Sequence, residues 1–193
     1  MSSFRRGFKA QSERKAVEVR KTLNFDDISP LSATILAEHL GVLIWSVNNV
    51  PGVDASDLHH LLVIEPDGLS AFTLRIGERY LVVFNPSQSD KRVNSVIMHE
   101  LAHIMLGHRL ASAGTSEDGH LLPSNYDQDQ EAEADWLGGT LLLPRPALLW
   151  MRKQGMTAPE ATEHFQVSTD MLNWRIRMTG VDHQLKHSWK KRS

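Results

Sequence analysis

The amino-acid sequence predicts an α+β fold with a small antiparallel sheet, two central helices and a C-terminal helical pair. Three observations support this fold class. Helical patterns cover most of the chain, three short apolar runs with turn residues between them lie within 61–84, and a Thr-x-x-Glu helix cap begins at Thr157. The 193 residues, 41% of them hydrophobic, suffice for one sizeable core. We therefore expect one globular body with more helix than strand.

The N-terminal part is expected to form two helices and a strand. Residues 12–23 place apolar side chains among charges, which indicates an amphipathic helix. In "SPLSATILAEHLGV", Pro30 stands near a helix start and Gly41 follows the last leucine, as is usual for the two ends of a helix. The run "VLIWSV" at 42–47 is then predicted to be a strand.

The sheet is predicted from the runs "LLVIE", "SAFTLRI" and "YLVVF". Turn formers at 66–68 (Pro-Asp-Gly) and 77–79 (Gly-Glu-Arg) separate these runs, which favours an antiparallel meander. We expect "SAFTLRI" to be an edge strand, to which an extended peptide could add by main-chain pairing.

A long helix is expected after the sheet. Ser87 or Ser89 would cap its N-terminus, and the helix should run to about Leu106 and stop at Gly107. This helix contains most of the stretch "VIMHELAHIMLGH" at 96–108.

The last part of the chain is predicted to be a loop followed by helices. Residues 111–128 are rich in Ser, Gly, Asp and Asn, which indicates a long loop. A helix should run from about Asp129 to Pro144, and 157–180 should form two short helices, with Ser168 as the second N-cap. These segments suggest an N-terminal helical arm (1–24), a core (25–150) and a C-terminal helix-turn-helix-like pair with a basic tail (151–193).

Charge is distributed unevenly along the chain. The net charge is −2, but both ends are basic, and residues 22–185 contain ten Lys or Arg against 21 Asp or Glu. An acidic body disfavours a general nucleic-acid binder, because phosphate contacts require concentrated positive charge. The basic ends, 1–21 and 186–192, are expected to be solvated.

Cysteine is absent, which excludes disulfides and thiolate metal sites. Any metal ion must therefore be held by imidazole and carboxylate groups. The N-terminus lacks the apolar region of a signal peptide, and no apolar run approaches the roughly 18 residues needed to span a membrane. We expect an unexported protein in the reducing cytoplasm, without a membrane partner.

The stretch at 96–108 contains the pattern His-Glu-x-x-His. His99 and His103 are four residues apart, so on a helix they lie on one face about one turn apart and can bind one metal ion. Glu100 is turned away by about 100° and could reach a water on that metal without binding it, which is the arrangement of metal-dependent peptidases. Two hydrogen-bonded core histidines with an exposed glutamate are the alternative.

A catalytic zinc site needs a third protein ligand. The metzincin pattern is excluded because Leu106 and Arg109 occupy its Gly and His positions. His108 stands one position before the place where a metzincin has its third His. We expect His108 to make a contact at the helix end or to support a ligand. The remaining source is a carboxylate from a later helix.

The acidic stretch "EAEAD" at 131–135 supplies such carboxylates. Glu131 and Asp135 are i and i+4 and share a helix face, so we favour Glu131 as the metal ligand and Asp135 as the partner of a ligand histidine. Glu133 is the less favoured ligand. Taken alone, the cluster also fits an exposed acidic turn near a helix N-terminus.

These motifs resemble the ImmA/IrrE family of zinc metallopeptidases. The matching segments are "RGFKAQSER", "LAEHLGV", "HELAHIMLGH", "EAEADWLGGTLLLP" and "FQVSTDMLNWRIRMTG". The resemblance implies a zincin-like, gluzincin-type site in which His99, His103 and Glu131 bind zinc and Glu100 is the catalytic base. The sequence departs from the family at 136–139 (Trp-Leu-Gly-Gly), where a Phe-Ala pair is more common. Glycine there loosens a helix by about 1 kcal/mol per residue.

The resemblance further implies a regulatory protease. Family members cleave or inactivate helix-turn-helix repressors, and several are encoded beside their target. Two His and one carboxylate also accommodate Mn²⁺ or Fe²⁺. The alternatives are an antirepressor that captures its target without cleaving it, and a DNA-binding regulator acting through 157–180. Three residues remain open as donors to the tetrahedral oxyanion: Tyr126, His120 and His108.

Overall fold

The computed structural model describes residues 4–110, 112–115, 121–124 and 127–190. The helices and strands in chain order are α1 (Phe8–Thr22), α2 (Ala33–Leu40), β1 (Leu43–Ser46), η1 (Val47–Asn49), α3 (Ala55–His59), η2 (His60–Ile64), β2 (Ala71–Ile76), β3 (Arg79–Phe84), α4 (Asp90–Leu106), β4 (Ser112–Thr115), β5 (Leu121–Ser124), α5 (Gln128–Leu142), α6 (Arg145–Lys153), α7 (Ala158–His164), α8 (Thr169–Thr179) and α9 (Val181–Lys190). Helix exceeds strand, and the α+β class is confirmed.

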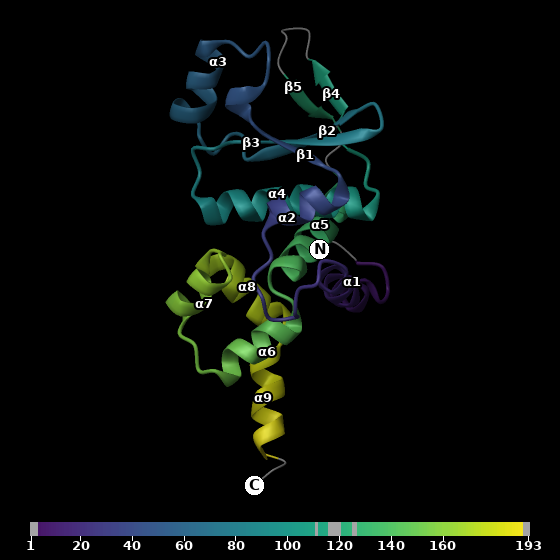
Figure 1. Cartoon of the computed structure of the whole chain (residues 1–193), viewed down its shortest axis with the longest axis vertical. Coiled ribbons are helices and arrows are strands. Elements are labelled where there is room, and N and C mark those ends of the chain that lie inside the picture. Colours follow the sequence, from purple (N-terminus) through teal and green to yellow (C-terminus); the bar gives the residue numbers. More distant parts are fainter. Residues whose placement is uncertain (1–3, 111, 116–120, 125–126, 191–193) are drawn as a thin grey trace.

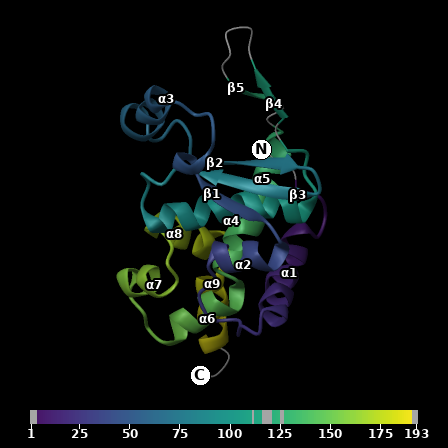
Figure 2. The ribbon, with the colours of Figure 1, turned by 45° about the horizontal axis from the view of Figure 1, so that its top comes forward.

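The elements form layers around α4. The sheet of β1, β2 and β3 lies on one side of α4, and α3 lies on the opposite face of that sheet (Figure 1). On its other side α4 packs against α5. Helices α1, α6, α7 and α8 make up much of the half of the molecule that lies away from the sheet (Figure 2). The main core is shared by α1, α2, α4, α5 and the C-terminal helices, and it includes Leu36, Leu101, Leu137 and Leu172. The helix α4 is therefore held from both sides.

The three-stranded sheet is mixed, which corrects the prediction of a wholly antiparallel sheet. Its strand order is β1-β3-β2, with β3 antiparallel to β2 and parallel to β1. The chain passes from β1 through α3 and η2 to β2, which runs opposite to β1, and the turn after β2 then reverses the chain so that β3 is parallel to β1. The strand β2 lies at the edge of this sheet, as the sequence predicted.

The run "LLVIE" is not a strand, and the three-stranded meander prediction was wrong at this point. Asp54 caps α3 by accepting hydrogen bonds from the backbone of Ser56 and Asp57, and the helical path continues through η2 as a π-helical turn. Leu58, Leu61 and Leu62 have the i, i+3, i+4 spacing of a helix, and all three pack on the outer face of the sheet.

The predicted loop at 111–128 contains two short strands. β4 and β5 pair with each other in an antiparallel register, Ser112 opposite Ser124. Their sequences, "SAGT" and "LLPS", have few of the β-branched and aromatic residues that indicate a strand, so only pairing reveals them.

The observed helix ends agree with the predicted ones where the sequence contains capping residues. Ser89 caps α4 at Arg92 N, and Gly107 ends that helix with a φ of 67°. Thr157 and Glu160 form the predicted capping box of α7, and Ser168 caps α8. The helices α6 and α9 were not predicted, and α9 gives a helical backbone to part of the expected basic tail.

Two buried arginines tie α1 and α8 to the C-terminal end of α5. Arg175 donates from Nε to the carbonyl of Leu143 at 3.0 Å and binds Glu13 of α1 at 2.6 Å. Arg20 donates to the carbonyl of Leu142 at 3.4 Å. Both arginines have no solvent exposure. The cationic groups complement the negative end of the α5 helix dipole, so they have a structural role.

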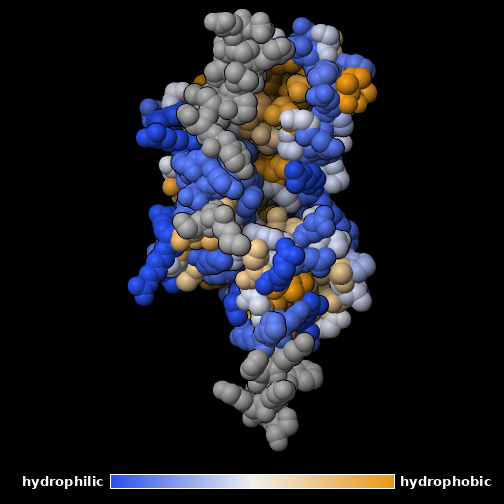
Figure 3. Space-filling model, turned by 180° about the vertical axis from the view of Figure 1, so that it is seen from behind, coloured by the Kyte–Doolittle hydropathy of each residue, from blue (hydrophilic) through white to orange (hydrophobic). Residues whose placement is uncertain are grey.

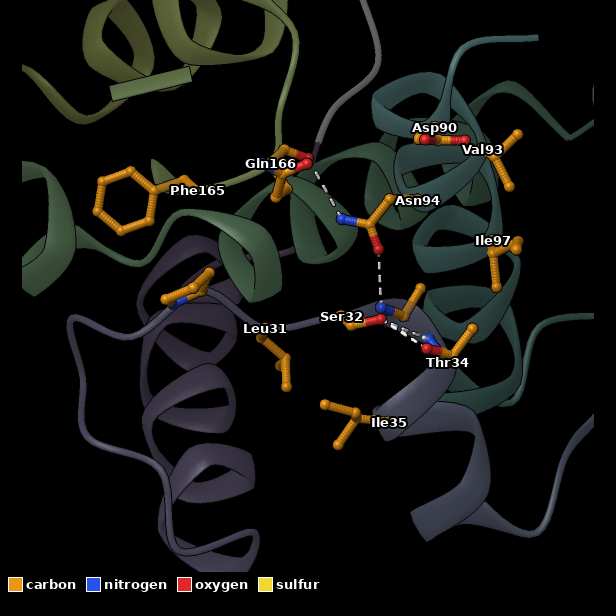
Figure 4. Close-up of a pocket in the computed structure, with 12 residues that line it drawn as sticks. Leu31, Ser32, Thr34, Ile35, Asp90, Val93, Asn94, Ile97, Phe165 and Gln166 are labelled. Carbon is orange, nitrogen blue, oxygen red and sulfur yellow. Dashed lines mark hydrogen bonds between the residues drawn. The ribbon is translucent and has the colours of Figure 1, made fainter. Parts of the chain in front are cut away.

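A mostly apolar cavity of about 400 Å³ lies between α2, α4 and the end of α7, and none of the residues of the His-Glu-x-x-His motif lines it (Figure 4). Asn94 spans its wall, accepting a hydrogen bond from Ala33 N at 2.8 Å and donating to the carbonyl of Gln166 at 3.4 Å. This side chain joins three segments of the core.

Apolar surface is also visible in a hollow in the upper half of the molecule, which carries the sheet and α3 (Figure 3). Large apolar side chains exposed in that half include Val63 and Ile64 of η2, Ile76 of β2 and Trp45 of β1. Among the described residues, no helix combines the length and apolarity needed to cross a bilayer.

Candidate metal centre

The two histidines of the motif face each other on α4. Their Nε2 atoms are 3.0 Å apart, and His103 is buried whereas His99 is partly exposed. The four-residue spacing places both rings on the side of α4 that meets α5. The Nε2 atoms of the two rings therefore point toward one another.

Glu131, in the first turn of α5, completes the group. Its carboxylate oxygens lie 3.2 Å from His99 Nε2 and 3.5 Å from His103 Nε2. One ligand atom from each of the three side chains lies within 4.8 Å of the others. The crossing of α4 and α5 therefore brings Glu131 to two histidines that precede it by 28 and 32 positions in the sequence.

The geometry of these three groups fits a zinc ion. A tetrahedron with bonds of about 2.0–2.1 Å has edges of about 3.3 Å, close to the three separations above. Two Nε2 lone pairs 3.0 Å apart would repel each other, so either one of the nitrogens carries a hydrogen or a cation lies between them. The donor set of two imidazoles and one carboxylate also leaves a fourth position free for water or substrate.

Asp135 contacts the far side of His99. Its Oδ1 lies 2.9 Å from His99 Nδ1, one turn along α5 from Glu131. The sequence predicted this pairing from the i, i+4 spacing. With Nδ1–H donated to Asp135, the Nε2 lone pair of His99 points toward Glu131 and His103.

Glu133, the less favoured ligand, lies outside the group. Its carboxylate contacts His108 Nε2 at 3.2 Å and Arg5 Nε at 3.5 Å. His108 in turn places Nδ1 3.0 Å from His103 Nδ1. Both ring nitrogens of His108 are thus engaged, which removes it as a free oxyanion donor. The other two candidates, His120 and Tyr126, lie outside the described residues.

Glu100 is held at the wall of the cleft by a threonine. The hydroxyl of Thr73, on β2, donates to Glu100 Oε2 at 2.6 Å. Thr73 is 5% exposed and Glu100 is partly exposed, so the contact lies partly buried at the wall of the cleft. Sequence reasoning did not find this role for Thr73, because it depends on β2 lying across α4. The one available signal was a polar residue on the core-facing side of a strand.

A cleft of about 320 Å³ opens at this group. His99, Glu100, Glu131 and Asp135 line it, and Ser70 and Ala71 at the start of β2 form part of its wall. The cleft is therefore bounded by the edge strand on one side and by α5 on another. A shallower cavity of about 290 Å³ continues from it toward Met171 and Trp174 of α8.

The charges of the group support one another without a metal ion. Burial disfavours the charged form of His99, but its hydrogen bonds to Asp135 and Glu131 and their negative charges outweigh this and raise the pKa of His99 to about 10. Hydrogen bonds from His103 and His99 hold the pKa of Glu131 well below its ordinary value. The metal-free site therefore holds a proton where a metal ion would bind.

The two glycines that depart from the family pattern allow close helix packing. A Cβ on Gly138 would lie 3.3 Å from His99 Cα on α4. A Cβ on Gly139 would lie 2.5 Å from the Trp174 ring and 3.1 Å from Arg175 Cδ on α8. The glycines thus let α5 approach both α4 and α8, which offsets their low helix propensity.

Replacing Gly139 with Ala should destabilise the protein by about 1–3 kcal/mol, because the new methyl group would overlap the partly buried ring of Trp174. Thermal and urea unfolding would measure the change in the free energy of unfolding. The same substitution in a Trp174→Leu background is the control, and it should cost less there. An equal cost in both backgrounds would contradict the packing explanation.

Comparison with known proteins gives a family and a fold. The family Peptidase_M78, described as the IrrE N-terminal-like domain, matches residues 55–177. No curated protein matches the chain. A solved structure of a Mycobacterium tuberculosis transcriptional regulator matches with a TM-score of 0.52 at 12% identity, covering 90% of this chain and 47% of that one.

The solved structure shows the fold alone at this identity, and the chain spans about half of its length. The family match covers nearly two thirds of the chain and includes α4, α5 and all three residues of the candidate metal-binding group. It confirms the resemblance inferred from the motifs. The protein therefore belongs to the Peptidase_M78 family, the IrrE N-terminal-like domain, which makes it a metallopeptidase-like protein.

Proposed function

We propose that this protein is a zinc-dependent metallo-endopeptidase that hydrolyses a peptide bond in a regulatory protein. The observation that carries the proposal is the group of His99, His103 and Glu131, with Glu100 beside it in the same cleft. We assign the first three residues as zinc ligands and Asp135 as the residue that orients His99. Manganese or iron fits the same donors, and metal analysis of the purified protein would distinguish them.

In the proposed reaction, Glu100 moves the proton. When bound, zinc supplies a water of lowered pKa and polarises the substrate carbonyl. Glu100 takes the proton of the attacking water and delivers it to the leaving amine. Thr73 holds one oxygen of Glu100 in place, so the carboxylate faces the cleft in a fixed orientation.

Replacing Thr73 with Val should lower kcat about 10–100-fold, since a hydrogen bond to a charged group is worth about 1.5–3 kcal/mol. Thr73→Ser keeps the hydroxyl and should retain most of the rate. Zinc affinity should be unchanged in both variants. Equal kcat values for the Val and Ser variants would show that the hydroxyl does not position Glu100.

The edge of β2 is the proposed alignment site for the substrate. Ser70 and Ala71 line the cleft, and β2 has a partner strand on one side in the described sheet. A substrate segment that paired with this edge would be extended past Glu100 and the three ligands.

We propose that the substrate is a helix-turn-helix repressor encoded near this protein, and that the two meet in the cytoplasm. The family supports a protein substrate, and the resemblance described above supports a repressor. The test is the mass of the regulator encoded nearest the gene, followed over time with zinc-loaded and chelator-treated protein. A cut that requires zinc would support the proposal. Stable binding without a cut would favour the capture alternative.

The DNA-binding alternative is disfavoured by the packing of α8. Leu172 and Arg175 are buried, and Trp174 packs against Gly139 of α5. A recognition helix must present its side chains to a groove. Of the two arginines on α8, Arg177 alone is exposed, which argues against nucleic acid as a partner.

A further inference from the structure

The two histidines of the metal-binding group are supported in different ways. His99 Nδ1 contacts a carboxylate directly, that of Asp135. His103 Nδ1 instead contacts another imidazole, His108 Nδ1, at 3.0 Å, and His108 Nε2 contacts Glu133 at 3.2 Å. The carboxylate that serves His103 therefore acts through an intervening ring.

Hydrogen-bond requirements fix one arrangement of protons along this path. His103 Nε2 faces Glu131 and His99, so Nδ1 of His103 carries the hydrogen when a metal is bound. His108 Nδ1 must then accept, which places the hydrogen of neutral His108 on Nε2. That Nε2–H donates to the Glu133 carboxylate. Every nitrogen on the path has a matched partner.

The path is enclosed and anchored at both ends. The side chain of His108 is 7% exposed and that of Glu133 is 17% exposed. Gly107, in the left-handed conformation, turns the chain so that the backbone N–H of His108 donates to the carbonyl of His103 at 3.1 Å. Arg5, in the segment before α1, lies 3.5 Å from the other oxygen of Glu133.

We propose that His108 and Glu133 are positioning residues that fix the tautomer and ring orientation of His103 for metal binding, with Arg5 holding the Glu133 carboxylate. The proposal rests on the metal centre described above and not on the peptidase reaction. It also accounts for the one glutamate of the acidic stretch that points away from the ligand group. Loss of a group that orients a ligand lowers metal affinity about 10–100-fold.

The test compares His108→Leu with His108→Asn. The two new side chains have nearly the same shape, but Asn can still accept the hydrogen from His103 Nδ1 and Leu cannot. Zinc affinity is measured by chelator competition, and the Co²⁺ absorption spectrum reports the coordination geometry. We expect a 10–100-fold loss of zinc affinity and an altered Co²⁺ spectrum for Leu, and near wild-type values for Asn. His39→Leu, an exposed position on α2, is the control.

Equal affinities for the Leu and Asn variants would overturn the proposal, because a packing role does not distinguish them. If His108→Leu fails to fold, Glu133→Ala and Glu133→Gln provide a second pair. There the amide oxygen of Gln can still accept from His108, so Gln should retain the affinity that Ala loses. Zinc affinity requires no substrate, so absence of proteolysis would leave this result intact. Failure of the wild type to bind zinc would instead overturn the metal centre itself.

Discussion

A Glu100→Gln variant is expected to cleave substrate about 10²–10⁴-fold more slowly while binding zinc as tightly as the wild type. The amide cannot accept a proton from water, whereas its oxygen can still receive the hydrogen bond from the Thr73 hydroxyl. Glu100 lies outside the group formed by His99, His103 and Glu131, so metal binding should not depend on it. The measurements are the initial rates at which the wild type and the variant cleave the intact regulator, and the zinc content of the wild type and the variant.

Two results would contradict the assignment of Glu100. Undiminished turnover in the variant would remove Glu100 from the reaction. Loss of bound zinc would make Glu100 a ligand and would reopen the role of Glu131. Glu38→Gln, on the exposed side of α2, is a matched control that should change neither quantity.

Zinc affinity is expected to rise with pH by about tenfold per unit between pH 6.5 and 8.5. The pKa of His99 is raised to about 10, so in this interval the metal-free protein holds a proton that zinc must displace. The direction of the pH dependence follows from the raised pKa of His99. Protonated His99 stabilises the metal-free fold below its unfolded pKa of about 6.5, and this stabilisation is lost as the pH rises toward 10. Proton release on zinc addition, measured by calorimetry in buffers of different ionisation enthalpy, would quantify the exchange.

An Asp135→Asn variant provides the control for this pH dependence. The Asp135 carboxylate is the largest of the influences that raise the pKa of His99, so its removal should lower that pKa. The increase in zinc affinity should then level off at a lower pH than in the wild type. A zinc affinity that does not change with pH in the wild type would show that His99 is not protonated in the metal-free protein.

The sequence predicted α4 and α5, the helices that carry the candidate metal ligands, because their signals are local. A four-residue spacing on one helix fixes the relation of His99 to His103, and the same spacing fixes Glu131 to Asp135. Capping residues such as Ser89 set the helix ends within a turn or two. Each signal acts over one or two helical turns, so it survives in any fold that keeps the helix.

The sequence failed where the structure depends on distant partners. Leu61 and Leu62 belong to a short apolar run, which suits a strand or a helix equally until α3 and the outer sheet face are known. The parallel pairing of β1 with β3 is set by a crossover, and no pattern within either strand specifies it.

In the candidate site, too, some features follow from local sequence signals and others from contacts between distant elements. Sequence alone determined the family, and it predicted the residues that could bind a metal and Glu100 as the base, because helical spacing and residue chemistry can be read from nearby positions in the chain. Only the tertiary structure decided that Thr73 holds Glu100, that Glu133 serves His108 and not the ligand group, and that Gly138 and Gly139 are sites of helix contact. These relations arise where α4 meets β2, α5 and the N-terminal segment. Contacts between elements far apart in the chain depend on how those elements pack, and packing is a property of the whole core.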